Sequence, residues 1–543
     1  MLNDDISYSH ALTRKSFKAS TLKRGKSKMD RQWIIWLTIG VYIVLMAVIG
    51  ITQGKKAKSI ADLTVGGRNA GAWLSALSYG TAYFSAVMFV GYAGGTGKAY
   101  GLWGVLAGIG NAVFGSWLAW KVLARRTRDA SARLKLKTMP QFLDKRYSST
   151  AMKLFACLVI FIFLVPYSAS VYKGLASVAE VLLGINVEIC MVIIAVVAAF
   201  LLVFGGYLVQ ARADFMQGIV MMFGVAMLIV CIVRCKAVGG FEGLVEYARN
   251  VSAQPSATNG FPTLNASQWI SLLATVLMTS FGTWGLPQMV QKYFGIKSDE
   301  QAKKGVTIST FFAFLVAGGG YFIGSLCYRY FTFAQLNDPS AEGYIVQDYI
   351  VPQMLAQSEL PSVLLGIVLV LLIAASVSTL CSVTLTASST LTIDFIGHFK
   401  KNMGDKKTSI IIKVLCVIFV ICSYLIANSD TPILDMMSYS WGIISGSFLA
   451  PYVISLFWKK MNTKGAWAGI LGGFFIAVVP AAAKIISGFA ATETVVMLAG
   501  KGPVFACIAM AASILLSVAV SAVTKNNNEK ETEFFYNGVV EAE

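Results

Sequence analysis

Long apolar runs alternate with short polar stretches along almost the whole chain, from about residue 34 to residue 523. A helix that crosses a bilayer needs about 20 mostly apolar residues, because each residue rises about 1.5 Å through a core of about 30 Å. Thirteen segments meet this requirement: 34–53, 74–95, 102–122, 150–178, 187–206, 210–236, 268–294, 305–330, 360–395, 409–427, 432–458, 464–488 and 502–523. The pattern predicts an all-α integral membrane protein with one transmembrane domain over residues 34–523, between polar tails at 1–33 and 524–543.

Composition agrees with this prediction. Hydrophobic residues make up 56% of the chain, charged residues make up 13%, and the mean hydropathy is +0.67. Soluble domains carry about a quarter charged residues. The polar stretches between the apolar segments are too short for a second folded domain, so no attached catalytic or sensor domain is expected.

The net charge of +18 raises the question of a nucleic-acid partner. The basic residues, however, gather in loops between apolar segments, above all in 123–149 and 399–408. This is the positive-inside bias, which sets orientation in a membrane. With loop 54–73 in the cytoplasm, the pattern predicts a multi-pass plasma-membrane protein, with its N-terminus outside and its C-terminus cytoplasmic. No nucleic-acid partner is expected.

The N-terminal tail disagrees with this orientation. Residues 1–33 carry eight Lys and Arg, which favour a cytoplasmic N-terminus. We therefore predict that translation starts at Met29, so that only Arg31 precedes the first apolar segment. Intact-protein mass spectrometry that found residues 1–28 would contradict this prediction.

Cysteine and histidine give no sign of a metal or catalytic centre. The nine cysteines lie in apolar segments without a CxxC pair, and the two histidines are His10 and His398. A disulfide framework and a zinc site therefore lack support. No His-Asp-Ser set or carboxylate pair emerges either, so an enzyme is not expected.

Two apolar segments contain helix-breaking residues. The second is rich in Gly and hydroxyl residues from Ser78 to Gly97, and the seventh holds Gly282, Gly285 and Pro287. Interrupted helices at matching places in two halves point to a transporter's binding site, and these segments are five apart, as an inverted repeat of five helices requires. Close helix packing is the alternative explanation for each Gly alone. The pair with Pro287 favours broken helices.

The ninth segment holds the densest polar cluster. Hydroxyl groups and freed carbonyls suit a hard cation such as sodium, which prefers oxygen ligands. For a single Ser or Thr, a bond to a carbonyl of its own helix is the alternative. The cluster begins Ala-x-x-Ser-Thr, and its size favours an ion site; it comprises Ala375, Ser376, Ser378, Thr379, Cys381, Ser382, Thr384, Thr386, Ser388 and Ser389.

Asp214 is the ionisable residue of interest in segment six. Carboxylates within membrane segments are often on ion pathways. Because Arg212 lies two residues away, a structural ion pair is an equally open explanation. Either a sodium or a proton route is compatible with this residue.

Several short stretches resemble one known family, the sodium/solute symporters, which carry proline, pantothenate, sugars, sialic acid and monocarboxylates. The resemblance covers about residues 34–500. It rests on Gly66-Gly67-Arg68, Thr138-Met139-Pro140-Gln141-Phe142-Leu143, Gly205-Gly206 with Asp214 and Gln217, Gln291-Lys292 with Lys297-Ser298, Ser378-Thr379 and Lys464-Gly465-Ala466.

The resemblance implies the leucine-transporter fold, with segments two to six and seven to eleven as a five-plus-five inverted repeat. It also implies a co-transported sodium ion bound by the carbonyls of Thr81, Phe84 and Ala375 and the hydroxyls of Ser378 and Thr379. Some members bind a second sodium, which here implies Asp214, Ser378, Cys381 and Ser382. Cys381 stands where such members have Ser, and a thiol is a poor sodium ligand, so more than one sodium is not expected.

By analogy with the family, the solute lies near Tyr83, Val87, Met88, Thr279, Thr283, Trp284 and Gln288. This set carries no charge, and Tyr83 replaces the Asp that proline carriers tend to have. A small amino acid or carboxylate at the broken-helix N-termini fits best. We therefore expect a sodium-coupled symporter of a small organic solute that needs no obligate protein partner. A proton-coupled carrier of the same fold, and a sodium symporter specific for proline or a sugar, remain as alternatives.

Overall fold

The computed structural model describes residues 29–54, 68–204, 207–400, 403–429, 431–525, 532 and 535–536. The predicted start at Met29 concerns residues 1–28, which lie outside the described residues. So do Gly66, Gly67, Gly205 and Gly206 and most of the tail 524–543.

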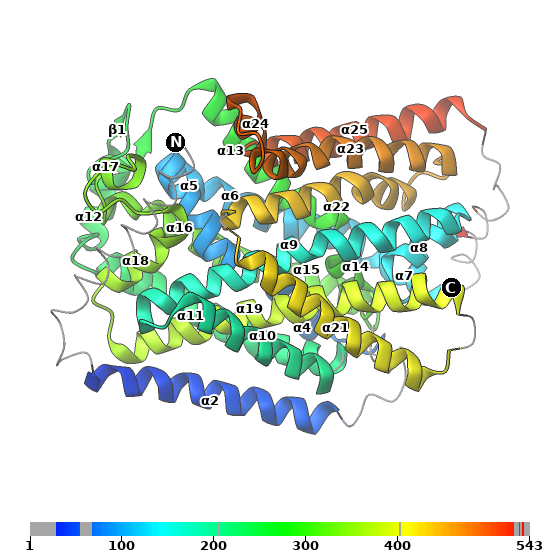
Figure 1. The fold of residues 1–543 in the computed structure, drawn as a ribbon, viewed down its shortest axis with the longest axis horizontal. Helices are drawn as coiled ribbons and strands as arrows, with labels where there is room; N and C mark the ends of the chain where they lie inside the picture. The colour runs from blue at the N-terminus through cyan, green and yellow to red at the C-terminus, as the bar shows by residue number, and fades with distance from the viewer. Residues whose placement is uncertain are drawn as a thin grey trace.

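The protein is a bundle of long helices that run roughly along one axis (Figure 1). Short 3-10 and π-helical turns, labelled η, continue several of them. The long elements are α2 (Met29–Gly54), α4 (Ala72–Tyr83), η2 (Val87–Tyr92), α5 (Ala93–Tyr100), η3 (Gly101–Gly104), α6 (Val105–Gly110), η4 (Asn111–Leu118), η5 (Trp120–Ala124), α7 (Arg125–Arg133), α9 (Thr150–Leu183), α10 (Val187–Phe204), α11 (Tyr207–Arg234), α13 (Ala266–Phe281), η6 (Gly282–Gly285), α14 (Pro287–Phe294), α15 (Asp299–Ala313), η7 (Phe314–Gly318), α16 (Gly319–Ser325), α19 (Ser362–Thr390), η10 (Leu391–Ile396), α20 (Gly397–Phe399), α21 (Asp405–Ala427), α22 (Ile433–Ser455), α23 (Thr463–Ser487) and α25 (Gly502–Val523).

Shorter elements cover the ends and one corner of the bundle. They are α8 (Met139–Tyr147), α12 (Gly240–Arg249), β1 (Val251–Ser252), β2 (Phe261–Pro262), η8 (Cys327–Arg329), α17 (Phe333–Asn337), η9 (Gln347–Tyr349), α18 (Ile350–Gln357) and α24 (Glu493–Ala499). The two strands pair in parallel, with Val251 opposite Phe261. In Figure 1, α12, α17 and α18 gather at one end, and α7 and α8 lie at the other.

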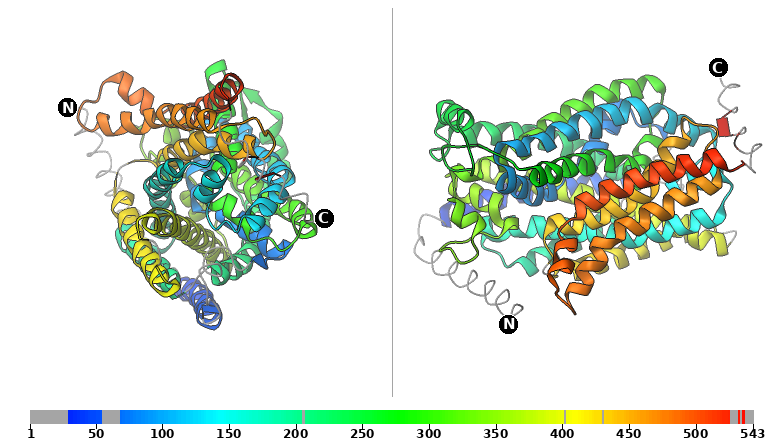
Figure 2. Two further views of the ribbon diagram at one scale, coloured as in Figure 1. Left: turned by 90° about the vertical axis from the view of Figure 1, so that its right-hand side faces the viewer. Right: turned by 90° about the horizontal axis from the view of Figure 1, so that it is seen from above.

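The helices pack around a buried centre. α9 contacts α19, α21 and α22, while α11 contacts α4 and α19. α2 lies on one flank, and α23 and α25 pair on the opposite flank (Figures 1 and 2). The centre is therefore formed by α4, α9, α11, α13, α14, α19 and α22.

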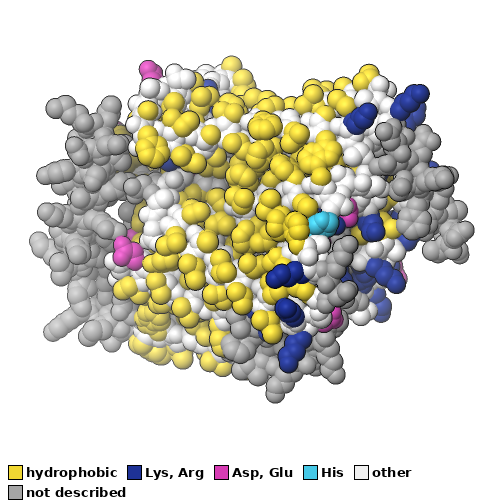
Figure 3. All heavy atoms as spheres, turned by 45° about the vertical axis from the view of Figure 1, so that its right-hand side comes forward, with side chains coloured by type: hydrophobic (Ala, Val, Ile, Leu, Met, Phe, Trp, Pro, Cys, Tyr) yellow, Lys and Arg dark blue, Asp and Glu magenta, His cyan; other side chains and the backbone are white. Residues whose placement is uncertain are grey.

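Hydropathy agrees with a membrane location. Within the described part of the chain, eight helices are long and apolar enough to cross a bilayer, or nine if the bent pair Ala266–Gly285 and Pro287–Phe294 is one span. Within the described residues, each of the thirteen predicted segments is mostly helical, but the number that crosses the membrane stays a prediction. Figure 3 shows hydrophobic side chains across the flank, with Lys and Arg gathered toward one end.

Two helices near the centre are interrupted, as the Gly- and Pro-containing segments predict. α4 ends at Tyr83, and Phe84 has an extended backbone with φ −106° and ψ 112°. Leu286 is likewise extended, with φ −80° and ψ 123°, and Pro287 opens α14 at a bend of 48°. Because Pro287 lacks a backbone N–H, one helical hydrogen bond is missing at this bend.

The predicted Thr138-Met139-Pro140 stretch builds the N-terminus of α8. Thr138 caps the helix by accepting from the Gln141 N–H, and the proline occupies the first turn. The Gln141 amide also donates to Asp394 Oδ1 over 2.7 Å, which ties α8 to η10 at the end of the α19 run.

Candidate ion and substrate site

The break in α4 faces the hydroxyl-rich part of α19. Thr379 Oγ1 lies 3.0 Å from the carbonyl oxygen of Thr81 and 3.0 Å from that of Ala375, and donates to both. All three residues are fully buried. Because α4 ends two residues after Thr81, the carbonyls near this end have fewer helical partners than those in the helix interior. The arrangement gathers neutral oxygens from two helices around one hydroxyl.

The other two predicted sodium ligands lie beside this group. Phe84 and Ser378 are both buried, Phe84 at the break and Ser378 next to Thr379. Ser378 Oγ donates to Asp214 Oδ1 over 2.6 Å. The predicted set is thus brought together around the α4–α19 contact, with Ser378 linking it to the carboxylate on α11.

Asp214 is paired with a lysine that the sequence reasoning did not assign to the site. Lys292 Nζ on α14 lies 3.1 Å from Asp214 Oδ2, and both side chains are buried, with exposed fractions of 2% and 0%. Lys292 also donates to Ser78 Oγ over 2.7 Å, and Ser78 donates to Asp214 Oδ2. Four elements, α4, α11, α14 and α19, therefore meet at one buried network, which we call the Asp214–Lys292 network.

The structure shows which basic residue pairs with Asp214, while its part in an ion pathway stays a prediction. Its described ion pair is with Lys292, 78 residues further along the chain, rather than with its near neighbour Arg212. The signal for Lys292 was present, since a basic residue in an apolar segment is unusual. The sequence alone gives Lys292 no more than a place in a family stretch, because its partner Asp214 lies 78 residues away.

The predicted second-sodium residues give a mixed picture. Cys381 and Ser382 are buried on α19, three and four residues after Ser378. Among the hydrogen bonds of the described chain, neither of the two side chains donates to Asp214; the carboxylate oxygens accept from Ser78, Ser378 and Lys292 instead. The positive charge beside Asp214 is thus supplied by the protein itself.

The predicted substrate residues all lie in the buried centre. Tyr83 donates through its hydroxyl to the Thr279 carbonyl over 2.5 Å, which joins the two broken helices. The Trp284 indole instead donates to the Phe114 carbonyl over 3.0 Å. The whole set is buried, with each residue no more than 8% exposed: Tyr83, Val87, Met88, Thr279, Thr283, Trp284 and Gln288.

Gln288 is the most informative member of this set. Its amide is fully buried at the start of α14, and neither Oε1 nor Nε2 has a hydrogen-bond partner. Two further buried donors without a partner are Tyr167 Oη on α9 and Trp441 Nε1 on α22. The rings of Tyr167 and Trp441 meet edge to face at 5.5 Å, and Trp441 lies 6.0 Å from Tyr83.

Buried polar groups normally find partners, so a polar ligand beside any of these groups would supply a missing hydrogen bond. The sequence alone does not single out Tyr167 and Trp441, because an aromatic residue in an apolar helix carries no distinguishing pattern.

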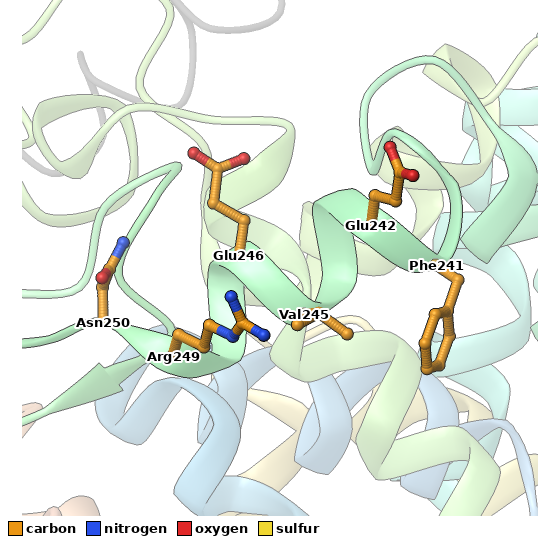
Figure 4. A pocket seen from close by; sticks show the side chains of 6 residues that line it. All are labelled: Phe241, Glu242, Val245, Glu246, Arg249 and Asn250. Carbon is orange, nitrogen blue, oxygen red and sulfur yellow. The ribbon is translucent and has the colours of Figure 1, made fainter.

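Among the described residues, no group of three or more His, Cys, Asp or Glu side chains is placed to hold a metal ion. A surface hollow lies along α12, lined by Phe241, Glu242, Val245, Glu246, Arg249 and Asn250 (Figure 4). It belongs to one short end helix and includes no residue of α4, α14 or α19.

Solved structures of two transporters share this fold. A Na+-coupled sialic acid symporter, solved in a substrate-bound outward-open state, matches with a TM-score of 0.70 and 17% identity, over 91% of this chain and 98% of that one. A nucleobase-cation-symport-1 family transporter in a closed conformation matches with a TM-score of 0.51 and 13% identity, over 87% and 98%. These likenesses show that this chain shares the fold of both solved structures.

The sequence comparisons give the family. A model of the sodium:solute symporter family matches residues 63–473, so this chain belongs to the sodium:solute symporter family. The osmoregulated proline transporter OpuE of Bacillus subtilis is 28% identical over 81% of this chain and 87% of its own length. The high-affinity proline transporter PutP of the same organism is 28% identical over 82% and 93%.

A sodium/proline symporter of Staphylococcus aureus is 25% identical over 83% of this chain and 86% of its own. With the family established, sodium is the co-transported ion, and the protein transports a small organic solute across a membrane.

Proposed function

We propose that this protein imports a small amino acid or carboxylate by alternating access, with sodium bound between α4 and α19. One observation carries the proposal: the Thr379 hydroxyl reaches the carbonyls of Thr81 and Ala375 at 3.0 Å each. When its hydroxyl hydrogen turns away, Thr379 presents a lone pair to the same space as the two carbonyls. Phe84 and Ser378 complete the proposed ligand set.

Sodium at this position would couple to solute through the break in α4. The ion joins a carbonyl of the broken α4 to a hydroxyl of the continuous α19, so it stabilises the arrangement in which the two helices stay together. Tyr83, two residues beyond Thr81, contacts the second broken helix at Thr279. A conformation that favours sodium thereby shapes the solute site, which is all that coupling requires.

The solute site is proposed around Gln288, Tyr167 and Trp441. These groups offer an amide, a hydroxyl and an indole N–H, all unpartnered and buried. They recognise a carboxylate or another hydrogen-bonding group, while the rings of Tyr83 and Trp441 accept an apolar body. Proline has both features, and the similar proline transporters make it the first solute to test.

We propose that one sodium accompanies each solute. The Lys292 ammonium already neutralises Asp214 and occupies its Oδ2. Together with the thiol at Cys381, this leaves a poor set of ligands for a second cation, because two positive charges so close repel.

We also propose an inverted repeat and an orientation in the membrane. The spacing of the breaks in α4 and α13–α14 supports the five-plus-five inverted repeat. The basic residues around α7 and α8 support a cytoplasmic location for that end, with the N-terminus outside.

Uptake into proteoliposomes tests the function. Radiolabelled proline, other small amino acids, monocarboxylates, pantothenate and sugars are offered with an inward sodium gradient, and with choline replacing sodium at fixed pH. We expect uptake of one amino acid or carboxylate class in sodium only. Equal uptake in choline that follows a proton gradient would favour the proton-coupled alternative.

A further inference from the structure

Tyr83 ends α4 at the break, and its side chain is held between the two broken helices. Its hydroxyl donates to the Thr279 carbonyl over 2.5 Å, and only 3% of the residue is exposed. Thr279 lies two residues before the end of α13, where backbone carbonyls have fewer helical partners. The hydroxyl thus supplies a hydrogen bond to a carbonyl near a helix end, and this bond fixes the tip of the ring.

A glycine in the neighbouring η4 makes room for this tip. A Cβ at Gly115 would lie 2.3 Å from the Tyr83 hydroxyl oxygen and 3.0 Å from Cε1 and Cζ of the same ring. The Tyr79 hydroxyl, one turn earlier on α4, donates to the Gly115 carbonyl over 2.7 Å and so ties α4 to this part of η4. The η4 backbone therefore touches the tip of Tyr83 and leaves the ring no space to move in that direction.

Three other aromatic rings surround the phenol of Tyr83. The Phe84 ring stacks on it with the ring centres 4.0 Å apart, and the Tyr79 ring meets it edge to face at 6.1 Å. The Trp441 ring of α22 lies 6.0 Å away. Stacked and edge-to-face rings are favourable arrangements of aromatic side chains. With a hydrogen bond at its tip and rings around it, Tyr83 forms a rigid wall between α4, α13 and α22.

This wall borders the proposed solute site. The Trp441 indole N–H and the Tyr167 hydroxyl are two of the buried groups that have no hydrogen-bond partner among the described residues. Trp441 packs with both Tyr167, at 5.5 Å, and Tyr83, at 6.0 Å. A solute that is hydrogen-bonded by Tyr167 and Trp441 therefore lies beside the phenol of Tyr83.

The chemistry of the wall limits what can lie against it. The hydroxyl hydrogen of Tyr83 is already donated to Thr279, so the side chain presents a solute with the apolar face of a ring and no charge. Protein interiors are close-packed, and an extra methylene without space for it forces the surrounding groups to move. A charged group of the solute against this ring would be buried without a partner, which is unfavourable.

We propose that Tyr83 sets the size limit of the transported solute. Its ring admits a solute whose far end is short and apolar, and it excludes solutes with a longer side chain or with a charged group at that end. Gly115 and Thr279 contribute by holding the ring in place. This inference rests on the proposed function, because it assigns a specificity-determining residue to the proposed solute site.

The test measures sodium-driven uptake for solutes that share one head group and grow one carbon at a time. Alanine, 2-aminobutyrate, norvaline and norleucine form one series, and acetate, propionate, butyrate and valerate form the other. The wild type is compared with Tyr83→Phe, Tyr83→Leu and Tyr83→Ala. Tyr79→Leu is the matched control, because Tyr79 is equally buried on α4 but also packs on Trp120 and Tyr293, outside the proposed solute site. Thermal unfolding first checks that each variant folds.

We expect the wild type to lose uptake efficiency, the maximal rate divided by KM, steeply beyond one chain length. Tyr83→Leu and Tyr83→Ala should raise the efficiency ratio of the longest to the shortest solute on the order of tenfold, the effect of one methylene in an apolar pocket. Tyr83→Phe keeps the ring and should keep the limit, as should Tyr79→Leu.

Two outcomes would overturn the size limit alone. The first is a wild type that takes all lengths equally well, which is decisive even if the smaller variants do not fold. The second is a folded Tyr83→Leu or Tyr83→Ala variant that keeps the wild-type preference. A wild type without sodium-driven uptake of any offered solute would instead overturn the proposed function, and this inference with it.

Discussion

At the scale of single residues, Asp214 and Lys292 form an ion pair buried in the centre of the bundle. Both groups are almost fully buried, and each carries a charge that is expensive to leave alone in a low-dielectric interior. Hydroxyl groups of Ser78 and Ser378 satisfy the remaining carboxylate positions. Removing one partner therefore leaves an uncompensated charge, whereas removing both does not.

A double-mutant cycle tests this account. We expect Lys292→Met and Asp214→Asn each to lower the free energy of unfolding by about 3–5 kcal/mol, and the double variant to lose less than the sum of the two. Unfolding in detergent provides the measurement. Lys304→Met is the control, since its pair with Glu300 is exposed and should contribute nothing measurable. Additive losses in the double variant would contradict a coupled pair.

Part of this candidate site is predictable from the sequence. Ser378 and Thr379 stood out because hydroxyl groups crowd one apolar segment, and Asp214 stood out because it is charged. Lys292, Tyr167 and Trp441 did not, since their roles depend on which helices meet in space. A pairing across 78 residues leaves no periodic signal in either helix.

At the scale of helices, glycine sets how closely the broken segment packs. A Cβ at Gly324 of α16 would lie 2.2 Å from the Ala93 carbonyl oxygen of α5, and one at Gly97 would lie 2.0 Å from the Gly324 carbonyl oxygen. Both distances are to backbone atoms, which cannot turn aside. The two backbones therefore touch, as small residues permit in membrane helices.

Substituting one of these glycines should separate the helices. We expect Gly324→Ala to lower the free energy of unfolding by about 1–3 kcal/mol, the usual range for overpacking. Gly318→Ala, in η7 of the same helical run, is the matched control because a Cβ there meets nothing within 4 Å. Melting temperatures in detergent compare the two. Equal melting of the two variants would show that the α5–α16 contact is not tight.

Helices were the most predictable level of the structure. Apolar runs placed helix at every expected segment, and Gly282, Gly285 and Pro287 marked the bend before α14. The break at Phe84 followed from the glycine and hydroxyl content around it, although no proline marks its position. The packing of α8 against α9 and α22 was not predictable, because polar ends of helices carry no hydropathy pattern.

At the scale of the whole molecule, sodium is proposed to link the broken helices to the continuous ones. The Thr81–Ala375–Thr379 contact joins α4 to α19, and the Asp214–Lys292 network joins α11 to α14 beside it. Sodium binding then favours one arrangement of the entire bundle, and the affinity for the solute changes with that arrangement.

The most direct test measures solute uptake as a function of sodium concentration for the wild type, Thr379→Ser and Thr379→Ala. Thr379→Ser keeps the hydroxyl and serves as the matched control. We predict that Thr379→Ser keeps sodium-driven uptake, whereas Thr379→Ala needs on the order of tenfold more sodium, the effect of about 1.4 kcal/mol of lost binding energy. An unchanged sodium dependence in Thr379→Ala would contradict a sodium site between α4 and α19.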